Sequence, residues 1–151
     1  MPRIRVEAER TVAAPADEVY EFLADYRRRP RILPPEFVEY RVDADGAQTI
    51  VHCRLRAGRR ERDYRLRAEE VVRGRQLRES DTRSSLVTTW DVSPAGSGVQ
   101  ARVQVATEWI GARGVGGVFE RLFAPLALRR VYTRMLSRLA HELEALPVSS
   151  A

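Results

Sequence analysis

The chain has 151 residues, a length that fits one domain, and its 44% hydrophobic content is ordinary for a globular protein. No stretch approaches the roughly 18 consecutive apolar residues of a membrane-spanning helix, which excludes integral membrane association. The first five residues lack an apolar signal core, so we expect a cytoplasmic protein. The single cysteine, Cys53, excludes an internal disulfide and fits a reducing compartment.

Positive charge comes entirely from arginine: all 26 basic residues are arginines, and the formal net charge is +5. Most of them alternate with acids, as in Glu61-Arg62-Asp63, and only the segment Arg27–Arg31 forms a basic cluster. The complete absence of lysine indicates a genome-wide codon composition that favours arginine, rather than selection for phosphate recognition. We therefore expect these arginines to form a solvated surface rather than a nucleic-acid or ribosome site.

The first elements are a strand and a short helix. Ile4, Val6 and Ala8 alternate with charged residues and predict a half-buried strand that ends before Pro15. Pro15 suits the first turn of a helix. One face of that helix is expected to be buried through Val19, Phe22, Leu23 and Tyr26. Prolines at 30, 34 and 35 leave room for only one helical turn around 31–33.

From 38 to 109 the sequence alternates between apolar and polar residues in short runs separated by turn residues such as Asp45-Gly46. This pattern predicts an antiparallel meander. The register of Glu79 is ambiguous in this pattern. We expect the inner face of the sheet to include Cys53, Leu55, Tyr64, Leu66, Thr88, Trp90, Val103, Val105 and Thr107.

A long amphipathic helix is predicted over 115–146, about 43 Å for the part from 118 onward at 1.5 Å per residue. Four glycines between 111 and 117 precede it and form either a plain connector or a mobile lid. Pro125 predicts a kink or a break. The first part would face a cavity through Phe119, Leu122, Phe123 and Leu126, and the leucine-rich second part would be core. Residues 1–146 then form the domain and 147–151 a flexible tail.

Strands followed by one terminal helix indicate an α+β fold in which a curved antiparallel sheet wraps the helix and leaves a hollow. Polar groups on the inner face are Tyr64, Thr88, Trp90, Thr107 and the Cys53 thiol. They would either orient an apolar ligand or satisfy one another in a solid core.

The sequence contains few histidine and cysteine residues, two types that often act in catalysis. His52 belongs to the polar side of its strand, and His141 lies among charged residues near the helix end. Adjacent strand residues point to opposite faces, so His52 and Cys53 cannot readily share a metal or form a nucleophile–base pair. We therefore assign no catalytic residue, no metal and no cofactor.

One segment resembles a known family. Residues 10–26, Arg10-Thr11-Val12-Ala13-Ala14-Pro15-Ala16-Asp17-Glu18-Val19-Tyr20-Glu21-Phe22-Leu23-Ala24-Asp25-Tyr26, are similar to the start of polyketide cyclase/dehydrase-like proteins of the START-domain/SRPBCC (birch-pollen-allergen-like) superfamily. Asp25-Tyr26, Pro30 and Leu33-Pro34 resemble its coenzyme Q-binding branch. The resemblance implies a helix-grip fold: a seven-stranded curved antiparallel sheet around the C-terminal helix, with two short helices between strands 1 and 2.

Members of that superfamily bind or process hydrophobic molecules, so the resemblance implies several functions. The leading expectation is non-enzymatic binding, for transport or sequestration, of a lipid, isoprenoid, quinone or aromatic polyketide by a monomer or homodimer. The alternative is a polyketide aromatase/cyclase or dehydratase, in which Tyr64 or Arg130 would act as a proton donor or bind an anion. A third is a ribosome-surface contact through Arg27–Arg31. The expected ligand-binding residues are Cys53, Leu55, Tyr64, Leu66, Thr88, Trp90, Val103, Val105, Thr107, Phe119, Leu122, Phe123 and Leu126.

Overall fold

The computed structural model describes residues 3–45, 48–57, 59–111 and 115–144, with the side chains of 45, 57, 60 and 115–124 outside this description. Within these ranges, seven strands, two α-helices and two short 3-10 helices follow one another. In order they are β1 (Arg3–Val12), α1 (Ala16–Ala24), η1 (Arg29–Ile32), β2 (Phe37–Asp45), β3 (Gln48–Ala57), β4 (Arg60–Val72), β5 (Gln76–Asp81), β6 (Val87–Ala95), η2 (Gly96–Gly98), β7 (Gln100–Ile110) and α2 (Val115–Glu144).

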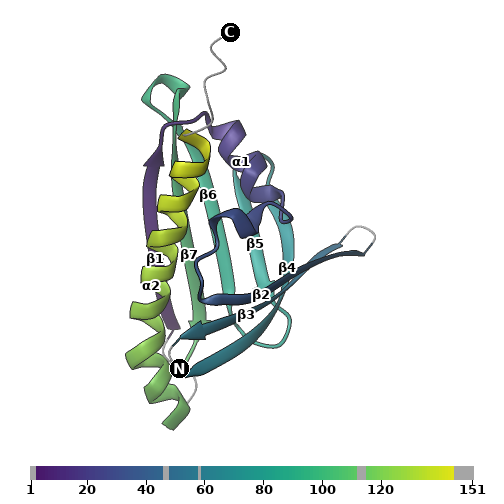
Figure 1. Cartoon of the computed structure of the whole chain (residues 1–151), viewed down its shortest axis with the longest axis vertical. Coiled ribbons are helices and arrows are strands. Elements are labelled where there is room, and N and C mark those ends of the chain that lie inside the picture. Colours follow the sequence, from purple (N-terminus) through teal and green to yellow (C-terminus); the bar gives the residue numbers. More distant parts are fainter. Residues whose placement is uncertain (1–2, 46–47, 58, 112–114, 145–151) are drawn as a thin grey trace.

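All seven strands form one antiparallel sheet in the order β1-β7-β6-β5-β4-β3-β2 (Figure 1). Neighbours from β2 to β7 are consecutive in the chain, as expected for a meander. Strand β1 pairs with β7 instead, so the connection that carries α1 and η1 crosses to the far edge of the sheet. The predicted α+β architecture, with a terminal helix and two short helices between the first two strands, is confirmed.

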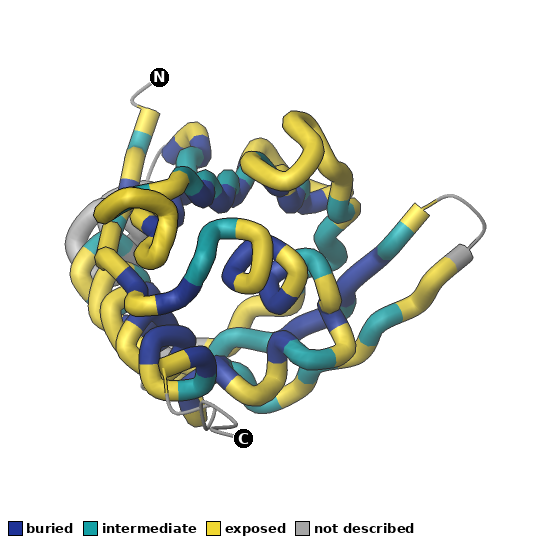
Figure 2. The backbone as a smooth tube through the Cα atoms, turned by 90° about the horizontal axis from the view of Figure 1, so that it is seen from above, coloured by how far each residue is buried: buried dark blue, intermediate teal, exposed yellow. Residues whose placement is uncertain are grey.

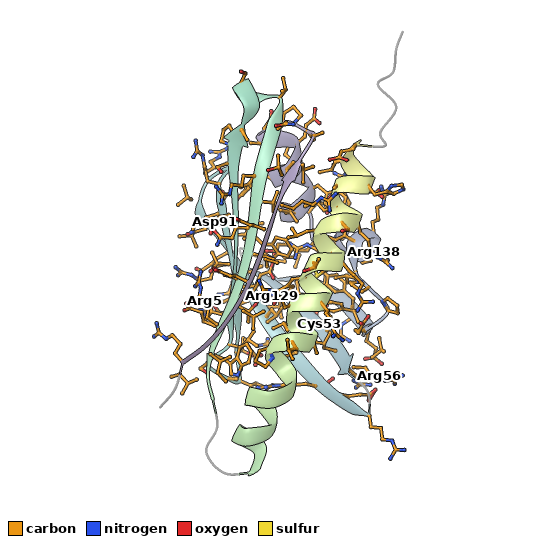
Figure 3. All side chains as sticks on the ribbon, turned by 90° about the vertical axis from the view of Figure 1, so that its left-hand side faces the viewer. Arg5, Cys53, Arg56, Asp91, Arg129 and Arg138 are labelled. Atoms are coloured by element: carbon orange, nitrogen blue, oxygen red, sulfur yellow. The ribbon has the colours of Figure 1, made fainter. Side chains whose placement is uncertain are left out.

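The two faces of the sheet differ as the alternating sequence predicts. On β6, Thr88, Trp90 and Val92 are buried while the residues between them are partly exposed. On the outer face, Arg5 contacts Glu108 at 2.5 Å, and Arg5 and Asp91 lie on the side of the sheet away from α2 (Figure 3). Seen from above, the sheet curves around the helices (Figure 2).

Helix α2 continues through Pro125, so of the two predicted alternatives the break is wrong and the kink stays a prediction. The helix begins at Val115, as predicted, and includes Gly116 and Gly117 of the glycine-rich segment, whereas 112–114 and 145–151 lie outside the described residues. The second half packs mainly on β1 and η1 through buried residues. These are Val131, Tyr132, Met135, Leu136, Leu139, Ala140 and Leu143, and they confirm that this half is core.

Within the described residues, no helix combines the length and the apolar character that crossing a bilayer requires.

Candidate functional site

A cavity of about 60 Å³ lies beside α2, on the concave side of the sheet. Strands β2 to β6, the segment 26–33 that follows α1, and residues 128–135 of α2 all contribute to its wall. Apolar side chains form most of that wall. They include Leu33, Phe37, Val51, Leu55, Leu66, Leu86, Leu128 and Met135.

Six of the expected ligand-binding residues lie on this wall: Cys53 and Leu55 from β3, Tyr64 and Leu66 from β4, and Thr88 and Trp90 from β6. Their common orientation follows from the period of two in each strand. Strands β3 and β4 pair Cys53 directly with Tyr64, so the two side chains lie next to each other. Whether these residues contact a ligand stays a prediction.

The other expected residues are placed differently. Val103, Val105 and Thr107 on β7 are fully buried but do not line the cavity. Helix α1 packs against β7, and Thr107 hydrogen-bonds Tyr132 of α2. Leu126 is 65% exposed on α2 and is not part of the wall. The side chains of Phe119, Leu122 and Phe123 fall outside the described part of the chain, so their predicted contacts stay untested.

The most polar part of the wall is a buried group of three residues that our sequence analysis did not assign to the site. Arg29 Nη1 lies 3.2 Å from Glu79 Oε2, and the Tyr26 hydroxyl donates to the same carboxylate at 2.9 Å. Arg29 Nη2 donates to the Leu23 carbonyl oxygen at 2.6 Å. The guanidinium also lies over the Tyr26 and Trp90 rings, 4.7 and 4.9 Å from their centroids. This places a charged pair against an apolar cavity.

Arg29 corrects our expectation that the cluster Arg27–Arg31 is a solvated surface. It is only 3% exposed, whereas Arg31 stays at the surface beside Glu142. Because a lone buried cation is very costly, Arg29 enters the interior only with Glu79 opposite it. Glu79 had a local signal: it shares a strand face with the buried Leu77. Arg29 had no such signal in the sequence, because only its tertiary contact with Glu79 distinguishes it from the neighbouring arginines.

Burial shifts the proton affinities of these groups. Desolvation raises the pKa of Tyr26 above its ordinary value, and the nearby Glu79 carboxylate raises it further. Desolvation lowers the pKa of Arg29, but Glu79 and the neighbouring tyrosines more than offset this, so Arg29 keeps its charge. Desolvation also raises the pKa of the Cys53 thiol to about 12, and that thiol is therefore protonated at neutral pH.

Three hydroxyl groups form a second polar cluster between the sheet and α2. Thr88 Oγ1 lies 2.7 Å from Thr107 Oγ1, and the Tyr132 hydroxyl hydrogen-bonds Thr107 and lies 3.4 Å from Thr88. Thr88 and Tyr132 line the cavity, while Thr107 lies behind them. These polar atoms satisfy one another, which is one of the two alternatives we had kept for Thr88 and Thr107.

The remaining candidate groups lie away from the cavity wall. His52 Nε2 lies 3.1 Å from Asp43 Oδ2 on the polar side of β3, and His141 and Arg130 are exposed on α2. In the described ranges, no three His, Cys, Asp or Glu side chains are grouped closely enough to hold a metal ion.

A curved antiparallel sheet that grips a terminal helix beside a cavity is the helix-grip fold. Residues 3–144 match the family described as polyketide cyclase/dehydrase and lipid transport, and the chain belongs to that family. No protein among those with curated functions matches it.

Solved structures give the same fold. The KanY protein, known from a solution structure, is 34% identical with a TM-score of 0.81, and the match covers 95% of this chain and 99% of that one. The Zhui aromatase/cyclase from Streptomyces sp. R1128 is 18% identical, with a TM-score of 0.79 and 99% of both chains covered. Norcoclaurine synthase from Thalictrum flavum, solved with dopamine and hydroxybenzaldehyde, is 17% identical; its TM-score is 0.70, and 98% of this chain and 90% of that chain are covered.

Proposed function

We propose that the protein binds a small hydrophobic molecule in the cavity beside α2, for transport or sequestration, and that it does so in the cytoplasm as a monomer or homodimer. The observation that carries this proposal is the composition of the wall. Apolar side chains surround a few buried polar groups, chiefly Arg29, Glu79 and Tyr26. Ligand sites in proteins have this composition, with polar groups that fix the orientation of an otherwise apolar guest.

The buried ion pair itself supports a functional interpretation. Arg29 and Glu79 are 3% and 5% exposed. Removing two charges from water costs several kcal/mol per ion before their attraction repays it, and an apolar pair of similar volume is often at least as stable. A charged pair on a cavity wall is therefore better explained by ligand recognition than by stability.

The size of the cavity constrains how a ligand enters. At about 60 Å³ it is smaller than the roughly 300–1,000 Å³ of typical drug-sized sites. Binding of a ring compound thus requires wall side chains to move. Met135 and Leu128 of α2 are suited to this, because long unbranched or flexible side chains change rotamer at low cost.

Native mass spectrometry of the freshly purified protein tests for a retained ligand, and thermal-shift assays with menadione, 1-naphthol and farnesol test binding directly. A ligand at about 100 times its Kd should stabilise the fold by about 2.7 kcal/mol. Leu55→Phe adds bulk inside the cavity and should abolish the shift. Ile4→Phe adds the same bulk to a half-buried position on β1, away from the cavity, and should retain it. Absence of any retained or added ligand in all these assays would contradict the proposal.

A polyketide aromatase/cyclase or dehydratase is the second candidate, and the family description together with the buried acid and phenol groups favours it. Tyr64 lies on the cavity wall and could exchange a proton with a substrate, whereas Arg130 is exposed. Incubation with a poly-β-ketone thioester should then yield an aromatic product with a new ultraviolet absorbance. If Tyr64→Phe leaves the turnover unchanged, Tyr64 does not have this role.

A further inference from the structure

Two buried nitrogen donors in the cavity wall have no hydrogen-bond acceptor among the described residues. They are Nε of Arg29 and Nε1 of Trp90. Both residues line the cavity, and the Arg29 guanidinium carbon lies 4.9 Å from the centroid of a Trp90 ring. Two neighbouring donors without acceptors therefore belong to one wall of one cavity.

Two of the three side-chain nitrogens of Arg29 already have partners. Nη1 faces Glu79 at 3.2 Å and Nη2 donates to the Leu23 carbonyl oxygen at 2.6 Å. These contacts fix the planar guanidinium, because its N–H groups point in set directions. Nε–H is the group left without an acceptor. Buried donors in native proteins nearly always have one, so the site calls for an acceptor atom from outside the protein.

The charge of the site indicates what kind of acceptor fits. The Glu79 carboxylate already balances the Arg29 guanidinium, and Tyr26, Cys53 and Trp90 nearby are neutral. An anionic ligand would lose its hydration on entering the apolar cavity and would meet the negative charge of Glu79. A neutral oxygen acceptor avoids both costs and still accepts hydrogen bonds.

We infer that Arg29 Nε and Trp90 Nε1 donate hydrogen bonds to neutral oxygen acceptors of an uncharged, otherwise apolar ligand. The inference rests on the proposed function, since it specifies the ligand class of the same cavity. It assigns Arg29 and Trp90 as residues that determine specificity.

Three probes of one shape separate the inference from the broader proposal. They are 1-tetralone, which carries a neutral ketone; tetralin, the corresponding hydrocarbon; and 1,2,3,4-tetrahydro-1-naphthoate, the carboxylate. Kd values are measured on the full-length protein by isothermal titration calorimetry. We expect 1-tetralone to bind about tenfold more tightly than tetralin, as a hydrogen bond to a buried donor predicts, and the carboxylate to bind most weakly.

Variants that remove one donor each test whether Trp90 and Arg29 bind the ligand oxygen. Trp90→Phe removes one donor and keeps a ring, and it should reduce the tetralone/tetralin ratio at least threefold. Trp109→Phe is a matched control: Nε1 of Trp109 is also buried without a described partner, but the residue does not line the cavity, so the ratio should not change. Arg29→Lys keeps a cation opposite Glu79 but lacks Nε, and it provides a second test if Trp90→Phe fails to fold.

Each result has a defined meaning. Equal affinity for tetralone and tetralin, or an unchanged ratio in both Trp90→Phe and Arg29→Lys, would overturn the inference while leaving a hydrophobic cavity function standing. Tightest binding of the carboxylate would overturn the preference for a neutral ligand. Failure of all three probes, combined with no stabilisation by the broader ligand panel, would overturn the proposed function and the inference together.

Discussion

Arg29 differs from the other arginines of the chain in what surrounds it rather than in its sequence context. Several other arginines form exposed pairs, such as Arg102 with Glu9 at 2.6 Å. Exposed pairs contribute little to stability because water and salt screen them. Arg29 and Glu79 are buried away from water and salt, so removing one partner of this pair affects stability much more than removing one partner of an exposed pair.

We expect Glu79→Gln to destabilise the protein by about 3–5 kcal/mol, because it leaves the buried Arg29 without a counter-charge. The glutamine can still accept the Tyr26 hydrogen bond, so the change isolates the charge. Urea unfolding followed by tryptophan fluorescence measures the difference.

The matched control for this prediction is Glu69→Gln. Glu69 lies 3.7 Å from Arg78 and both are exposed, so the loss should stay within about 1 kcal/mol. Similar losses for the two variants would show that Arg29 finds another partner when Glu79 is neutral.

At the scale of elements, α2 performs two tasks along one stripe. Leu136, Leu139 and Leu143 pack as core, whereas Tyr132 and Met135 are buried and also line the cavity. The sequence predicted the stripe from its helical period, but it could not divide the stripe into core and cavity wall. That division depends on where the helix lies on the sheet, over β1 rather than over its middle.

The hydroxyl cluster joins α2 to the sheet, so Tyr132→Phe should destabilise the protein by about 0.5–1.5 kcal/mol. The loss stays moderate because Thr88 and Thr107 remain bonded to each other. Thr133→Val removes an exposed hydroxyl from the same helix and should change stability by less than about 0.5 kcal/mol. Chemical denaturation of both variants provides the comparison, and an equal effect would show that the buried cluster contributes nothing beyond a surface hydroxyl.

For the whole molecule, folding buries several groups in their protonated form. The pKa of Cys53 rises from 9.0 to about 12, and burial raises the pKa values of Tyr26, Tyr40 and Tyr132 above 10.0. Between these ordinary values and the folded ones, the unfolded chain binds fewer protons than the folded chain. Stability must therefore fall as the pH rises through this range, and these groups have no such effect below pH 9.

We expect the free energy of unfolding to decline from about pH 9, where the unfolded thiol begins to ionise. In Cys53→Ala the decline should begin about one pH unit later, near the ordinary tyrosine value of 10.0. Urea unfolding at intervals between pH 7 and 11 measures both profiles, and only their shapes are compared, because the variant also loses the volume of a buried thiol. Identical onsets would show that Cys53 ionises as readily in the folded protein as in the unfolded one.

The sequence by itself determined the succession of strands along the chain, the two short helices, the terminal helix and six residues of the cavity wall, because a period of two or 3.6 indicates which face of an element is apolar. The tertiary structure decided the rest. Val103, Val105 and Thr107 are buried in the core instead of on the cavity wall, and Arg29 meets Glu79 across 50 residues of chain. Periodicity assigns a side chain to a face, whereas contact between distant faces depends on how the sheet curves and where the helix rests on it.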